Sequence, residues 1–245
     1  MRKTLWPCIL LAMFSGVASH AQMELDIESG YVFSGYNDVR IPNDTGTLFS
    51  LTDDLETASN IYYRGRLTYS LDDRHSLSIL VAPLTLNAEG TIDRSVRYQA
   101  AEFPPHAPLK ATYRFDSYRL TYRYTFHRSP SLRLGIGLTA KIRDASITLE
   151  GNGIRAEKAN TGFVPLLHFQ ADWNFAERWG LLLSGDAAAA SQGRAEDVSV
   201  VLRRTLSSSI DVKIGYRILE GGADVDEVYN FTLIHYLAAG LIISL

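Results

Sequence analysis

Residues 117–143, SYRLTYRYTFHRSPSLRLGIGLTAKIR, alternate apolar and polar side chains on both sides of a short polar break. The even-numbered positions are apolar or aromatic from Tyr118 to Phe126 and again from Leu132 to Ile142. Arginine, lysine, threonine, serine and glycine fill the odd-numbered positions between them. A period of two with many aromatic and β-branched residues is typical of β-strands that have two unlike faces. The stretch therefore predicts an antiparallel hairpin that turns within 127–130.

The same period recurs after residue 22 and predicts about ten strands. The connections alternate in length: 37–58, 89–111 and 145–160 are long, 220–227 is moderate, and 191–195 is short where a long loop is due. This rhythm predicts an all-β fold, an antiparallel up-and-down transmembrane β-barrel with short turns at one end and loops outside the cell at the other. The expected strands are 24–36, 59–71, 75–88, 112–126, 131–144, 161–175, 178–190, 196–206, 209–219 and 228–245.

Aromatic side chains gather near both ends of these strands, as in the two interfacial girdles of a membrane barrel. Trp173, Phe175 and Trp179 lie at the short-turn end, while Tyr63 and Phe163 lie toward the loops. The alternative is a soluble sandwich or lipocalin-like barrel, which turns its apolar face inward. Periodicity alone does not separate the two. The aromatic ends, the ten-strand rhythm and an N-terminal export signal favour the membrane barrel.

Three segments depart from the pattern. Pro83 and Pro165 fall inside predicted strands, where a closed barrel offers no free edge, and are interpreted as bulges near the rim. Segment 187–197 is poorly patterned. An eight-stranded barrel with a helical or looped excursion at that segment is the alternative topology.

Residues 1–21 have the pattern of a cleavable secretory signal. Two basic residues precede an apolar run from Leu5 to Phe14, which is too short to span a bilayer, and cleavage is expected after Ala21. The barrel domain would then be 22–245. Cys8 is the single cysteine, so neither a disulfide nor a cysteine-based metal site is expected in that domain.

The amino-acid composition excludes several other classes of protein. No stretch after residue 22 runs 18 apolar residues without a charged or strongly polar group, which argues against a helical membrane protein. With 46% hydrophobic and 21% charged residues, the chain is not a disordered one. Residues 22–245 hold 22 basic and 27 acidic residues, a net charge of −5, which argues against nucleic-acid binding.

The end of the chain resembles that of Gram-negative outer-membrane β-barrel proteins. Residues Val228–Leu245 form an alternating strand whose last residue is apolar, although Leu245 stands where this family usually has phenylalanine. The segment 216–231, YRILEGGADVDEVYNF, is similar to a tail found in uncharacterised small single-chain members. The resemblance implies integration in the outer membrane and recognition of the last strand by the barrel assembly machinery. It also implies contact with membrane lipid and lipopolysaccharide, and a monomer is expected.

The charged side chains on the more polar strand faces are expected to point into the barrel, because a cation near the lipid midplane costs about 2–4 kcal/mol. Glu24, Asp26 and Glu28 share this face on the first strand. The predicted lumen charge network comprises Arg64, Arg66, Arg119, Arg123, Arg133, Lys141, Arg143, Asp172, Asp186, Asp211, Lys213 and Arg217.

Three functions follow from such an interior. A salt-bridged, largely filled lumen indicates a structural or surface-interaction protein, and the small strand number favours it. A basic lining would instead make a narrow, porin-like channel for small solutes, in which the positive charge favours anions. The third hypothesis is a rim enzyme acting on lipid or peptide.

The histidines give little support for the enzyme hypothesis. His168 is expected to join the lumen network, His106 lies in a proline-rich loop, and His235 is expected to face lipid. None has a serine or aspartate partner at a defensible spacing, so no catalytic residue is predicted. The acidic, glycine-rich loop 220–227 could hold a divalent cation, but it lacks the EF-hand spacing, and a solvated loop is the favoured interpretation. No metal site and no cofactor are predicted.

Overall fold

The computed structural model describes residues 22–245, and the predicted signal segment 1–21 lies outside the described residues. The described chain is all β. No helix in it is long and apolar enough to cross a membrane. Its strands are β1 (Gln22–Arg40), β2 (Phe49–Ser50), β3 (Glu56–Thr57), β4 (Asn60–Ser70), β5 (His75–Ala82), β6 (Thr85–Thr91), β7 (Val96–Tyr98), β8 (Ala101–Phe103), β9 (Pro108–Arg128), β10 (Leu132–Gly151), β11 (Ile154–Ala176), β12 (Trp179–Ala190), β13 (Gly193–Thr205), β14 (Ile210–Val225) and β15 (Val228–Ser244).

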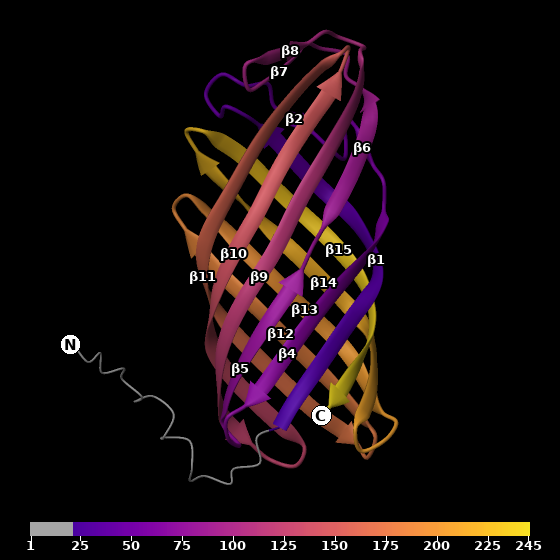
Figure 1. The fold of residues 1–245 in the computed structure, drawn as a ribbon, viewed down its shortest axis with the longest axis vertical. Coiled ribbons are helices and arrows are strands. Elements are labelled where there is room, and N and C mark those ends of the chain that lie inside the picture. The colour runs from indigo at the N-terminus through magenta and orange to yellow at the C-terminus, as the bar shows by residue number, and fades with distance from the viewer. Residues whose placement is uncertain (1–21) are drawn as a thin grey trace, which may run out of the picture.

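Ten of these strands close into an antiparallel barrel, which confirms the predicted fold class (Figure 1). The ring runs β1, β4, β5, β9, β10, β11, β12, β13, β14 and β15, and β15 pairs back onto β1 from Glu24↔Ser244 to Arg40↔Tyr229. Closure leaves no unpaired strand edge around the lower barrel, which is the condition for crossing lipid. Strand β6 continues the line of β5 against β9, while β2, β3 and the β7–β8 hairpin lie outside the ring.

The two ends of the barrel differ. At one end, here the turn end, β1 begins, β15 ends, and short turns join β4 to β5, β9 to β10, β11 to β12 and β13 to β14 (Figure 1). At the other, the loop end, β9, β10 and β11 project beyond the other strands of the ring. The plug, residues 41–58 and 92–107, also lies at the loop end and includes β2, β3, β7 and β8.

Two of the predicted loops are strands, so those predictions were wrong. Segment 145–160 completes β10 and β11, which meet at a tight turn where Asn152 and Gly153 have φ of 51° and 76°. Left-handed φ at both central residues is what a type I′ hairpin turn requires, and asparagine and glycine tolerate it. Segment 220–227 is likewise mostly strand, because β14 reaches Val225 and β15 begins at Val228. Both segments carry charges on strand faces that water reaches, so the apolar outward pattern of the lower barrel does not continue into them.

The alternative topology was also wrong. Segment 187–197 is neither helix nor excursion, but the end of β12, a two-residue turn and the start of β13. Its pairing is regular from Ala187↔Glu196 to Ala190↔Gly193. The run of alanines hides the alternation, since alanine suits both faces.

Both strand prolines lie where a ladder is incomplete, rather than at bulges in continuous ladders. Pro83 stands between β5 and β6, at the position where the strand breaks. Pro165 pairs with Ala140 of β10, but β12 pairs with β11 only from Leu167 onward. A free edge beside Pro165 therefore exists because β11 is longer than β12. Proline is tolerated at such an edge because it has no N–H to donate.

The outer face of the lower barrel is apolar. Ile79, Leu120, Ile136, Leu138 and Ile214 are each more than half exposed there. In water such a surface would be costly, since a contiguous apolar patch on a soluble monomer rarely exceeds a few hundred Å². The strands thus place their apolar side chains outward and their charges inward, the arrangement of a barrel that spans a membrane.

This polarity reverses toward the loop end. On β9 the outward side chains change from Tyr118 and Leu120 to Lys110 and Arg114, while the inward ones change from Arg119 to apolar Tyr113 and Leu109. On β10 the outward series passes from Ile142 to the partly exposed Asp144 and Glu150, and the apolar side chains of Ile147 and Leu149 point inward. We name the projecting part the head: β6, 108–116, 144–151 and 154–161. It has the faces of a water-soluble sheet.

The head and the plug share a buried apolar core. Phe49, Tyr98, Phe103 and Leu149 are almost completely buried in it. The β7–β8 hairpin is tied down as well: Tyr98 donates a hydrogen bond from its hydroxyl to the Ile147 carbonyl at 2.7 Å. The loop end of the lumen is therefore filled by packed side chains.

Candidate functional site: a buried ion-pair layer above a polar cavity

A layer of buried charges crosses the lumen below the apolar core. Strand alternation turns these side chains inward, and seven of them contact one another across the barrel. We call this set the central layer: Glu28, Arg64, Arg119, Asp186, Asp197, Lys213 and Arg217.

Asp197 is the most connected member. Its carboxylate lies 2.6 Å from Arg119, 2.7 Å from Arg217 and 3.1 Å from Arg64. The side chain is only 3% exposed. A carboxylate so far from water is tolerated only because the three guanidinium groups surround it and donate hydrogen bonds.

Glu28 is the second centre of the layer. Arg217 donates to both of its oxygens, at 3.0 and 3.1 Å, and the Lys213 ammonium lies 2.8 Å away. The Tyr62 hydroxyl donates a further hydrogen bond at 3.1 Å. Lys213 also reaches Asp26 at 2.6 Å, so carboxylates and cations alternate across the lumen.

Asp186 connects the layer to a histidine. Its carboxylate accepts hydrogen bonds from Arg119 at 2.6 Å and from the Thr139 hydroxyl at 2.7 Å, and it lies 2.9 Å from Nδ1 of His168. The two residues are 18 positions apart in the chain, a spacing that does not indicate a pair, so the sequence prediction missed the aspartate partner of His168. The pair orients the imidazole of His168, which also lines a cavity at the turn end.

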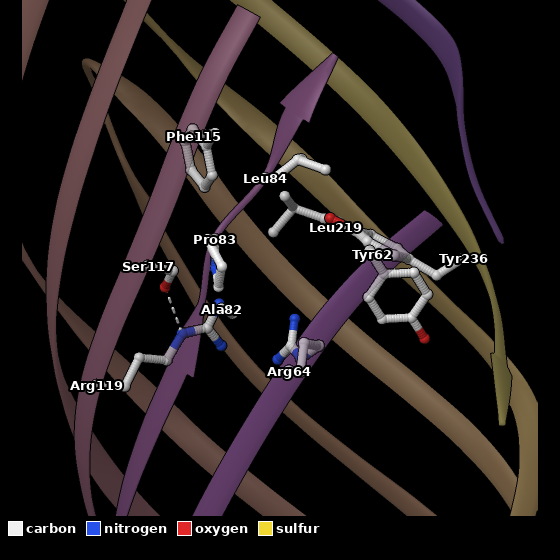
Figure 2. Close-up of a pocket in the computed structure, with 10 residues that line it drawn as sticks. All are labelled: Tyr62, Arg64, Ala82, Pro83, Leu84, Phe115, Ser117, Arg119, Leu219 and Tyr236. Carbon is white, nitrogen blue, oxygen red and sulfur yellow. Dashed lines mark hydrogen bonds between the residues drawn. The ribbon is translucent and has the colours of Figure 1, made fainter. Parts of the chain in front are cut away.

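The upper boundary of the layer is sharp. Figure 2 shows Arg64 and Arg119 on one side and Leu84, Phe115 and Leu219 on the other. The space between them is about 10 Å³, close to the volume that one water molecule needs. Here the charges therefore meet packed apolar side chains directly.

A much larger cavity lies below the layer, at the turn end. Its volume is about 590 Å³, and its rim includes the exposed turn residues Asp73 and Arg128. Arg66, His168 and Asp26 line its inner part, next to the central layer. The interior is thus filled at the loop end and hollow at the turn end, in contrast to the largely filled lumen expected from the strand number.

The twelve residues of the predicted lumen network fall into several groups. Arg64, Arg119, Asp186, Lys213 and Arg217 belong to the central layer. Arg66, Arg123, Arg133 and Asp172 line the cavity. Asp211 lies 3.2 Å from Arg203, which also bonds Asp172. Lys141 is buried against the ring of Phe115, and Arg143 donates to Asn160 near the head.

Two important inward charges were missed, Asp197 and Arg203. The alternation of Val198, Val200 and Leu202 on β13 marks the opposite face as inward, so the signal was present. The signal is weak because valine also occurs on the inward face of this strand, at buried Val201.

Comparison with solved structures places this geometry in a known architecture. The crystal structure of the outer membrane protease OmpT from Escherichia coli is similar, with a TM-score of 0.58 and 10% identity over 91% of this chain and 97% of that chain. The chain has the outer-membrane β-barrel fold. At this identity the likeness extends to the fold alone.

Two further barrels match less closely. The transport unit of the autotransporter AIDA-I from Escherichia coli has a TM-score of 0.47 and 10% identity, covering 97% of this chain and 94% of that chain. Ail, the attachment invasion locus protein of Yersinia pestis, has a TM-score of 0.42 and 10% identity, covering 90% and 99%. No protein-family model matches the chain, and no curated protein matches it in sequence.

The remaining histidines lie apart from the central layer of this outer-membrane barrel fold. His235 packs on the outer surface, where it stacks on Phe33 with ring centroids 5.0 Å apart and bonds the Tyr216 hydroxyl. His106 is a left-handed residue of the plug, with φ of 58°. Within residues 22–245, His168 has Asp186 as its sole hydrogen-bond partner, so a nucleophile does not contact its ring.

No group of three or more histidine, cysteine or acidic side chains that could hold a metal ion occurs in the part of the chain that the structure describes. The acidic segment 220–227 is instead tied into the strand ladder and to neighbouring cations. Glu220 accepts hydrogen bonds from Arg194, and Glu227 lies 2.8 Å from Lys158.

An ion pair holds the two halves of the plug together. Arg94 donates to both oxygens of Asp54 at 2.8 and 3.0 Å and also bonds the Leu48 carbonyl. The Arg94 guanidinium holds the pKa of the Asp54 carboxyl below its ordinary value, assisted by the Ser50 N–H. A depressed pKa in the folded state stabilises the plug above pH about 3.9, and the effect is lost as pH falls through the lowered pKa.

We expect Asp54→Asn to increase proteolysis of the plug at pH 7 by at most about fivefold, because a partly exposed pair contributes under about 1 kcal/mol. Limited trypsin digestion of the folded protein measures the rate. Asp53→Asn, at the exposed neighbouring position, is the matched control and should leave the rate unchanged. Equal rates for the two variants would show that the pair does not hold the plug.

Proposed function

We propose that this protein is a non-conducting barrel of a Gram-negative outer membrane that carries a folded, water-exposed head for contacts at the cell surface. The observation that carries the proposal is the reversal of polarity along β9 and β10. Apolar side chains face outward up to Tyr118 and Ile142, and polar ones face outward beyond Asp116 and Asp144. The outward face of the head carries paired charges, such as Lys110 with Glu89 at 3.0 Å.

The sealed lumen supports the structural role over a channel. An ion entering from the turn end would meet the central layer and then the apolar core, and neither offers a continuous polar path. Moving the core aside would separate side chains such as Phe49 and Tyr98, whose rings lie 6.2 Å apart in an edge-to-face contact. We therefore assign the head as the surface for contacts outside the cell, with no catalytic role.

Planar-bilayer recording tests the sealed lumen. The refolded protein is expected to give no stepwise conductance at moderate voltage, because the central layer and the plug close the path. Discrete conductance steps that fall when Arg119 is replaced by glutamine would identify a channel instead. Turnover of a phospholipid or peptide that His168→Ala abolishes would identify an enzyme.

Single-cysteine labelling tests the orientation of the head, since Cys8 is the single cysteine of the full sequence. On intact cells, a membrane-impermeant maleimide should label Ala159→Cys on the head and spare Ser131→Cys at the turn end. Both positions are exposed, so the difference reports sidedness. Leu138→Cys, on the apolar outer face, should stay unreactive until the protein is unfolded. Labelling of Ser131→Cys alone would reverse the orientation and exclude a surface role for the head.

A further inference from the structure

The turn-end cavity contains guanidinium groups without an anionic partner. Arg66 donates to the Ser78 hydroxyl at 3.1 Å, and Arg123 donates to the Gln170 side chain. Within the described chain, neither has a carboxylate oxygen within 4.0 Å. The Arg123 Nε is buried and has no hydrogen-bond partner at all. An unsatisfied buried donor on a charged group is costly, so a missing acceptor is the simplest account of it.

Most of the other charged side chains of the cavity are already paired, although Arg74 bonds only the Tyr124 hydroxyl among the described residues. Asp172 accepts from Arg133 at 2.5 Å and from Arg203 at 3.0 Å. Asp73 lies 2.6 Å from Arg128 at the rim. Asp26 is taken by Lys213, and Asp72 accepts backbone N–H groups of its own turn. Positive charge is therefore left over in the inner part of the cavity.

Glu24 is the exception among the carboxylates. It lines the same cavity but, among residues 22–245, makes no ion pair within 4.0 Å. It is the one internal group that could compete for Arg123. The carboxylate of Glu24 would repel an anionic ligand, so a variant that lacks this charge should bind the ligand more tightly.

We propose that the turn-end cavity is a blind binding site for a small anion that presents phosphate or carboxylate oxygens to Arg123 and Arg66. The planar guanidinium fork matches both kinds of oxygen pair. A volume of about 590 Å³ lies within the range of small-molecule sites. The central layer closes the cavity from above, so the ligand enters and leaves by the turn end, which faces the periplasm if the head is at the cell surface.

Binding to the refolded protein in an uncharged detergent at low salt tests the proposal. Isothermal titration calorimetry with pyrophosphate and with succinate as probes distinguishes phosphate from carboxylate ligands. At least one probe should bind saturably with a stoichiometry of one. Arg123→Gln should weaken that binding by about tenfold or more, since it removes a charge-assisted hydrogen bond, and Arg66→Gln should weaken it to a similar degree.

Arg128→Gln is the matched control. It removes the same charge from the rim, but its guanidinium is already paired with Asp73, so the affinity should change by less than about twofold. Glu24→Gln should tighten binding. Equal losses in all three arginine variants would show a nonspecific charge effect and overturn the proposal, as would the absence of saturable binding by either probe.

A second readout does not depend on affinity. Ser70 lines the cavity, and Ser70→Cys would be the single thiol of the barrel domain. The bound probe should slow its reaction with a charged maleimide, while Ser131→Cys, outside the cavity, should react at an unchanged rate. The same measurement in the Arg123→Gln background should show no protection. Heat-modified electrophoretic mobility would show that this variant is still folded, so the lost protection would be assigned to the site.

Discussion

Replacing Asp197 by asparagine is expected to destabilise the barrel by about 3–5 kcal/mol, the usual cost of leaving buried charges without a counter-charge. Arg64, Arg119 and Arg217 all converge on this carboxylate. The amide keeps the size of the side chain but removes its charge, and its NH₂ group points a donor at guanidinium donors. Unfolding by guanidinium chloride in detergent micelles, followed by tryptophan fluorescence, measures the difference.

Two companion variants make the result specific. Asp211→Asn also removes a carboxylate bonded to an arginine, but Asp211 is partly exposed and contacts Arg203 alone, so a loss under about 1 kcal/mol is expected. Adding Arg64→Gln to Asp197→Asn should recover part of the stability, because one uncompensated cation is removed. If Asp197→Asn and Asp211→Asn cost the same, the central layer does not stabilise the barrel.

The sequence predicts the lower barrel well because one physical rule governs it. Because lipid surrounds the barrel and charges lie inside it, every second residue is apolar, as from Tyr118 to Phe126. The alternation along a strand therefore predicts which side chains face lipid and which face the lumen. Above the membrane the rule reverses. The same strands continue through Asp116 and Asp144, but their alternation changes phase, and the charges at 145–160 were interpreted as a loop.

The partners in the central layer were beyond sequence reasoning for a different reason. Glu28 and Arg217 are 189 residues apart in the chain. Their meeting depends on barrel closure and on the stagger of all ten strands. A single irregularity changes the phase: β1 is bulged between Ser34 and Tyr36, so Val32 and Val39 both point inward despite their odd spacing. Alternation predicts which residues enter the lumen, whereas register decides which of them touch.

The central layer and the plug contribute differently to the stability of the protein. The central layer joins strands of the ring, so its loss weakens the whole barrel. The plug joins segments outside the ring to the head, so its loss can be local, as expected for regions of lower stability. The β7–β8 hairpin is held by backbone bonds such as Gln99 N–H to the Ile41 carbonyl at 2.8 Å and by the apolar core.

Phe103→Ala is therefore expected to release the β7–β8 hairpin while the ring stays folded. Phe103 is 0% exposed, and truncation of such a buried ring costs about 3–5 kcal/mol. This cost exceeds the local stability expected of a short hairpin outside the ring. Trypsin should therefore cut after Arg94 and Arg97 at least about a hundredfold faster than in the parent protein.

Phe163→Ala removes the same ring from the outer surface, where Phe163 is 67% exposed, and should leave the cleavage rate unchanged. The ring strands should resist trypsin in both variants, and the heat-modified electrophoretic mobility of the folded barrel should persist. Conductance should remain absent in Phe103→Ala, because the central layer still closes the lumen below the plug. Resistance of Phe103→Ala to cleavage would show that the plug does not depend on the apolar core, and global unfolding would show that ring and plug form one cooperative unit.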